Sequence, residues 1–116
     1  MREELEERLR YLEEQKEDLK HLEQEMRSAA KEFEQSEYRS HMQYEEQLLY
    51  AEKMPFLREI LTEQRELVLE ADRNYRDMQE EMQYEFQKRK RSCEEEYAVC
   101  RRALERAEES DRDREE

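Results

Sequence analysis

Apolar residues recur along this chain at spacings that place them on one face of a helix, with charged residues at most positions between them. The clearest rows repeat every eleven residues, and one lies in each half of the chain: Tyr11, Leu22, Phe33 and Tyr44 in the first, and Ala71, Met82, Cys93 and Leu104 in the second. Eleven residues in three turns is about 3.67 residues per turn, which gives a stripe that runs nearly straight or drifts slightly in a right-handed sense. The rows therefore predict long helices that do not form a conventional left-handed heptad coil.

A single proline, Pro55, divides the pattern near its middle. Proline disfavours the helical conformation at the residue before it, Met54, and suits the first turn of a new helix. The last residues, 110–116, contain no apolar side chain, and we expect them to fray. We predict one domain over residues 1–109 with this organisation: a helix over residues 2–52, a turn at about residues 52–55 and a helix over residues 55–109.

The two halves of the pattern mirror each other about the proline. If the chain folds back at Met54, Phe33 comes to lie opposite Tyr75 and Leu22 opposite Phe86. A single kinked rod would not require such a mirror, so the sequence predicts an all-α protein, an antiparallel two-helix hairpin. The residues expected in the seam between the helices are Tyr11, Leu22, Met26, Phe33, Leu48, Ile60, Tyr75, Met78, Met82, Phe86 and Tyr97.

A second apolar row flanks this seam on the half of the hairpin nearest the turn. In an antiparallel helix pair, positions displaced in the same sense from the seam lie on the same side. We therefore expect one partner-binding patch formed by Tyr38, Met42, Leu49, Leu61 and Val68. The alternative is a widened seam in which these side chains fold inward.

The composition narrows the function classes further. The chain has 116 residues with 35 acidic and 22 basic side chains, a net charge of −13, 34% apolar residues and no glycine. So few apolar residues cannot form the compact core that a globular enzyme needs. The abundance of helix-forming residues argues against a disordered chain. The one basic cluster, residues 88–91, lies within a helical pattern flanked by Glu, so we expect no nucleic-acid binding. No arrangement of Ser, Cys or His would activate a nucleophile, and we expect neither an enzyme nor a cofactor.

The cysteines and the apolar runs exclude several other kinds of site. Cys93 and Cys100 are seven residues apart, about 10 Å along a helix, so they cannot bridge each other, and we expect them to be small apolar core positions. His21 and His41 lie far from them in sequence, so no metal site is predicted. The apolar runs are too short to span a bilayer and the start lacks an apolar signal segment. We expect a cytoplasmic protein whose export, if any, would use a route independent of a signal peptide.

A hairpin of about 100 residues with a central turn resembles the small helical proteins of type VII secretion. Ordinary members carry Trp-x-Gly in the turn, and this chain has neither Trp nor Gly. It looks more like the divergent targeting partners of LXG-domain toxins in Gram-positive bacteria, which bind the helical toxin domain side by side. The export signal of that system is an aromatic residue followed four positions later by an acid, a spacing that Phe33 and Glu37 match. The resemblance implies an adaptor or chaperone, with a companion subunit supplying the export signal.

Two other interpretations remain open. One is a structural protein in which hairpins assemble into a homodimer or a four-helix bundle. The other is a rod-like stalk of a type III export apparatus, although such stalks are usually longer and more basic. If the chain is an adaptor, its partner is a helical client or companion subunit. If it is a structural protein, its partner is a second copy of itself.

Overall fold

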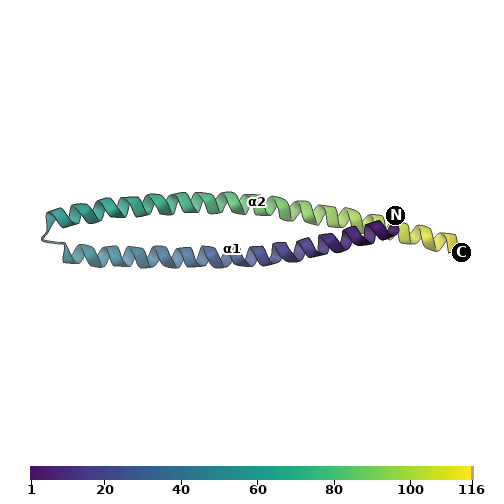
Figure 1. The fold of residues 1–116 in the computed structure, drawn as a ribbon, viewed down its shortest axis with the longest axis horizontal. Coiled ribbons are helices and arrows are strands. Elements are labelled where there is room, and N and C mark those ends of the chain that lie inside the picture. Colours follow the sequence, from purple (N-terminus) through teal and green to yellow (C-terminus); the bar gives the residue numbers. More distant parts are fainter. Residues whose placement is uncertain (116) are drawn as a thin grey trace. The chain divides into compact units, whose positions relative to one another are not determined.

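The computed structural model describes residues 1–115 and consists of two helices, α1 (Arg2–Tyr50) and α2 (Pro55–Glu115). The helices run in opposite directions and are joined by a turn at residues 51–54 (Figure 1). The described part of the chain contains no strand. The prediction of an all-α helical hairpin with its turn before Pro55 is confirmed.

The helix ends reflect local chemistry. Glu3 and Glu4 in the first turn of α1 suit the positive end of a helix dipole. In the turn, the Met54 amide donates to the Ala51 carbonyl at 2.9 Å, and Ala51 is fully buried. Pro55 then occupies the first position of α2, where its missing N–H costs nothing. Helix α1 ends two residues earlier than residue 52, because the turn requires residues 51–54.

The end of α2 differs from the prediction. Residues 110–115 are helical rather than frayed, and residue 116 lies outside the described residues. Arg2 forms ion pairs with Glu108 at 3.7 Å and with Asp111 at 3.2 Å. The hydrogen bond to Asp111 raises the pKa of Arg2 above its ordinary value. These contacts from α1, together with helix-forming Arg and Glu, favour helix beyond the last apolar residue.

The chain divides into two units, and each helix contributes a segment to both. The terminal unit comprises Met1–Glu25 and the residues from Tyr84 onward, and the turn unit comprises Met26–Gln83. That residues 1–109 form a single domain stays a prediction.

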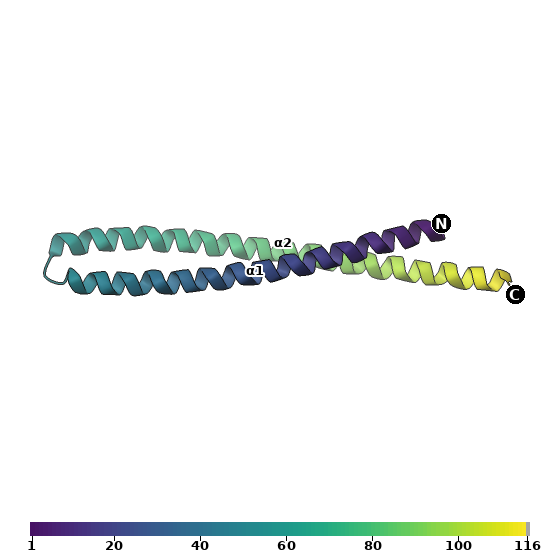
Figure 2. The ribbon, with the colours of Figure 1, turned by 60° about the horizontal axis from the view of Figure 1, so that its bottom comes forward.

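A small apolar core lies in the terminal unit. Leu12, Cys93 and Cys100 are buried together, with Leu5 packed against them. The Cys93 sulfur lies 3.7 Å from the Leu12 carbonyl oxygen and the Cys100 sulfur 3.3 Å from that of Leu5. In both ribbon views the start of α1 lies alongside α2 and crosses it (Figures 1 and 2). The prediction that both cysteines are small apolar core positions is confirmed, and both are free thiols.

On each helix a row of buried or half-buried positions repeats every seven residues. On α1 they include Leu5, Leu12, Leu19, Met26, Phe33 and Ser40, and on α2 Arg65, Asp72, Gln79, Phe86, Cys93, Cys100 and Ala107. Leu12 is 3% exposed, whereas its predicted seam neighbour Tyr11 is 49% exposed. Residues spaced by eleven and residues spaced by seven follow lines of different slope on the helix surface, and these lines meet over a short stretch only. Where they diverge, the residue next to the seven-residue row points away from the other helix.

The seam prediction is correspondingly mixed. It is wrong for Tyr11 and Leu22, which are one position from Leu12 and from half-buried Glu23. It also places Met78 and Met82 in the seam, and the structure leaves both exposed. The remaining predicted seam residues are buried or half-buried: Met26, Phe33, Leu48, Ile60, Tyr75, Phe86 and Tyr97.

Candidate protein-binding groove

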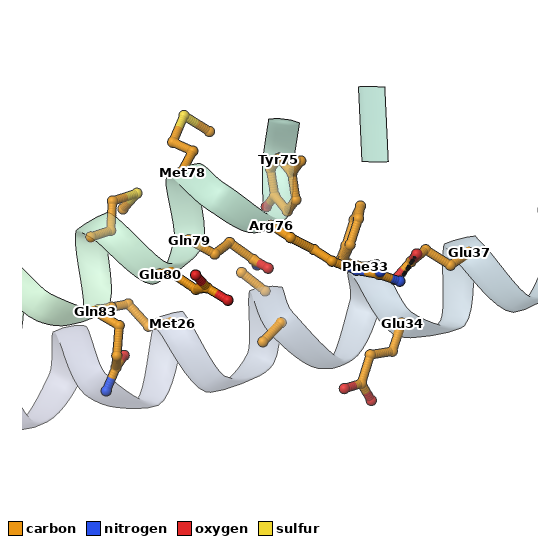
Figure 3. A pocket seen from close by; sticks show the side chains of 13 residues that line it. Met26, Phe33, Glu34, Glu37, Tyr75, Arg76, Met78, Gln79, Glu80 and Gln83 are labelled. Carbon is orange, nitrogen blue, oxygen red and sulfur yellow. Dashed lines mark hydrogen bonds and ion pairs between the residues drawn. The ribbon is translucent and has the colours of Figure 1, made fainter. Parts of the chain in front are cut away.

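A groove of about 620 Å³ lies between α1 and α2 within the turn unit (Figure 3). It extends from Met26 and Gln83 at one end to Glu37 and Arg76 at the other. Its lining is mainly apolar and comes from both helices: Met26, Ala29, Ala30 and Phe33 from α1, and Tyr75, Met78 and Met82 from α2. A groove of this kind offers space for large side chains of another helix.

The groove exists because two adjacent lining residues of α1 are small. Ala29 and Ala30 fill little of the space between the helices, and the seam position on α2 there is polar Gln79. On one side of this gap the rings of Phe33 and Tyr75 point toward one another, with centroids 4.4 Å apart. This contact confirms the predicted pairing of these two residues. Met78, which also lines the groove, is half exposed.

Charged side chains mark the edges of the groove. Arg76 reaches from α2 to Glu37 on α1 and forms an ion pair with it (Figure 3). Glu34 and Glu80 also line the groove, so the lining holds three carboxylates and one guanidinium. The groove therefore presents an apolar floor with an acidic edge, an arrangement that attracts basic side chains beside an apolar stripe.

The ion pair at the end of the groove is expected to contribute little to folding. The Glu37 side chain is only 18% exposed, but Arg76 is 58% exposed, so water screens the pair from the Arg76 side, and such surface pairs are worth at most about 1 kcal/mol. Glu37→Gln should therefore lower the free energy of unfolding by about 0.5 kcal/mol in urea titrations. A loss of several kcal/mol would contradict this assignment and make Glu37 a structural anchor of the turn unit.

The five predicted partner-binding residues do not line this groove. Tyr38, Met42, Leu49 and Val68 are exposed, and Leu61 is half-buried. Leu61 is therefore less available to a partner than the sequence indicated, because it lies four residues before the half-buried seam position Arg65. A partner surface formed by these five residues stays a prediction, and it is the alternative to binding in the groove.

A second exposed cluster surrounds the turn, and sequence reasoning did not identify it. Tyr50 is 78% exposed and Phe56 is 76% exposed, with Leu49, Met54 and Leu57 also exposed. The available signal was the concentration of large apolar residues on both sides of the Ala51–Met54 turn, where surface turns are normally polar.

Residues 1–115 contain no group of three or more His, Cys, Asp or Glu side chains that could hold a metal ion. Neither helix, as far as it is described, has an apolar stretch sufficient to cross a membrane.

Comparison with known proteins gives no match: no family model, curated protein or solved structure is significantly similar to this chain.

Proposed function

We propose that this chain is a non-enzymatic adaptor that binds a helical protein through the groove of the turn unit. The observation that carries the proposal is the groove itself, whose apolar lining is left half exposed at Met78 and Met82. Ala51 is the only buried residue of the turn unit. A two-helix layer cannot cover its own apolar surface, and a third helix laid along it would.

The amount of exposed apolar surface supports the same proposal. Among residues 1–115, seventeen large apolar side chains are exposed, and twelve of these lie in the turn unit. Most of the exposed apolar side chains therefore lie in the turn unit, where a protein partner would cover them.

The groove also constrains the partner. A helix with apolar residues at i, i+3, i+4 and i+7 matches a groove between two helices. A large side chain of that helix would occupy the space above Ala29 and Ala30, and Lys or Arg at its flank would face Glu34 and Glu80. The partner expected from this geometry is a basic, amphipathic helix or helical hairpin.

We further propose that this partner is a toxin exported by a type VII secretion system. The antiparallel hairpin architecture supports this proposal. Phe33 and Glu37, which match the spacing of the export signal, are engaged inside the turn unit by Tyr75 and Arg76. A signal must be accessible to the export machinery, so we expect a companion subunit to supply it.

Co-expression tests the proposal. The chain is produced with the long helical N-terminal domain of a toxin encoded beside it, and the mixture is analysed by size-exclusion chromatography with light scattering. We expect co-elution as a stoichiometric complex. Separate elution of the two proteins contradicts the adaptor, and a stable homodimer or four-helix assembly that ignores the toxin domain supports the structural alternative.

A further inference from the structure

The end of the hairpin at the turn is the most apolar exposed part of the molecule. We call residues 49–58 the tip. Five large apolar side chains are exposed there within nine residues, namely Leu49, Tyr50, Met54, Phe56 and Leu57. Soluble proteins rarely leave such a cluster uncovered without an interaction that uses it. The tip is separate from the groove, because none of these residues lines it.

The charge of the tip differs from that of the rest of the chain. The tip carries one acidic residue, Glu52, and two basic residues, Lys53 and Arg58, a net charge of +1 in a chain of −13. Neither Lys53 nor Arg58 forms an ion pair within the described residues 1–115. The tip is therefore a place where two copies of this acidic chain can approach without strong repulsion, and each copy offers two unpaired cations.

The helix ends at the tip are also poorly neutralised. Helix α1 has no basic residue in its last turn, and α2 has no acidic residue in its first turn. Met54, which precedes α2, has no side-chain oxygen to accept from the first amides. The negative end of the α1 dipole and the positive end of the α2 dipole are thus both available to an oriented partner.

We infer that the tip binds the tip of a second copy of this chain. A two-fold axis perpendicular to the plane of the two helices places the end of each α1 against the start of the partner's α2, so that the dipoles oppose one another favourably. The same axis brings the Lys53 and Arg58 cations of one copy toward the Glu52 carboxylate of the other. The inference does not rest on the adaptor function, because it uses a different surface.

The groove is a poorer place for a second copy. Glu34 and Glu80 would meet the same carboxylates of the other chain, and like charges side by side disfavour association.

The tip avoids this repulsion but offers a limited area. With about 150–250 Å² for a fully buried aromatic side chain, the five tip side chains bury about 500–600 Å² per copy. Over both copies the buried area is about 1,000–1,200 Å², at or below the lower limit of the roughly 1,200–2,000 Å² that stable complexes bury. We therefore expect a weak and reversible dimer, with a Kd of about 100 μM.

Sedimentation velocity over about 10 μM to 1 mM tests the inference. The sedimentation coefficient of the wild-type chain should rise with concentration, and the Tyr50→Ser/Phe56→Ser variant should stay monomeric, at least about tenfold weaker in association. A matched control, Tyr84→Ser/Val99→Ser, removes two exposed apolar side chains of the terminal unit and should dimerise like the wild type. Circular dichroism establishes that each variant remains helical.

A charge variant gives an independent reading. Lys53→Glu/Arg58→Glu keeps every apolar side chain of the tip but makes its charge negative, and it should weaken the dimer, most of all at low salt.

A wild type that stays monomeric throughout overturns the inference, as does equal loss of association in the control. Flotation of monomeric wild type, but not of the Tyr50→Ser/Phe56→Ser variant, with phosphatidylcholine vesicles also overturns it, because the tip would then bind a membrane surface. If the tips do not bind each other, the proposal that a client binds in the groove is unaffected, because the groove is unchanged in every variant.

Discussion

Leu12→Ala is expected to lower the free energy of unfolding by about 2–5 kcal/mol and the melting temperature by about 10 °C or more. Leu12 is 3% exposed and packs with Cys93 and Cys100 in a buried cluster of the terminal unit. Removing its isopropyl group leaves a cavity that two helices cannot close without losing their other contacts. Thermal and urea unfolding followed by circular dichroism measure the effect.

The matched control is the adjacent residue. Tyr11→Ala removes a larger side chain, but Tyr11 is 49% exposed, so this variant should cost less than about 1 kcal/mol. The pair of variants separates the seven-residue stripe from the eleven-residue row that the sequence suggested. A Tyr11→Ala variant that unfolds as easily as Leu12→Ala would restore the eleven-residue seam.

Met78→Glu/Met82→Glu is expected to reduce binding of the helical client by at least about 100-fold. Both methionines line the groove and are half exposed in the free chain, so the variant should keep its helicity. In the complex the two carboxylates would be buried against apolar surface, and each costs several kcal/mol to desolvate without a partner. Isothermal titration calorimetry with the helical toxin domain that we propose as the client measures the loss.

Met42→Glu is the control for this prediction. Met42 has the same side chain and the same 50% exposure as Met78 but lies outside the groove. It should bind the client within a few-fold of the wild type. If Met42→Glu abolishes binding and the groove variant does not, the client uses the surface of Tyr38, Met42 and Leu49 instead.

The hairpin was predictable because its causes are local and repeated. One proline ends one helix and begins the next, and the apolar residues on either side mirror each other well enough to place Phe33 against Tyr75. The burial of Cys93 and Cys100 followed from their common helix face. Each of these predictions depends on spacing along the chain, which a sequence records directly.

The seam was harder to predict because its polar members hide the seven-residue repeat. Leu5, Leu12 and Leu19 keep that repeat in apolar residues, but the stripe in the turn unit continues through Ser40 on α1 and through Arg65 and other polar residues on α2. Arg65 nevertheless donates to the Ser40 hydroxyl at 3.0 Å and so belongs to the interface. A count of apolar residues therefore favours the eleven-residue rows, although the helices pack along the other stripe.

The groove depends on side-chain volume rather than on polarity. Ala29 and Ala30 count as apolar in any pattern, and only the structure shows that they leave space between the helices. The tip was missed for a related reason, because Tyr50 and Phe56 look like helix-end residues in the sequence, and their exposure depends on how the turn closes over Ala51.

The methyl groups of the methionines offer the most direct test of the groove as the binding surface. The chain has six, of which Met26, Met78 and Met82 line the groove and Met1, Met42 and Met54 do not. Carbon-13 methyl NMR spectra are recorded during titration with the helical domain that we propose as the client, at chain concentrations well below those at which tips would associate. Binding in the groove predicts shifted or broadened signals from Met26, Met78 and Met82 with the other three unchanged. A bound complex in which Met42 responds and the three groove methyls stay unchanged would contradict it.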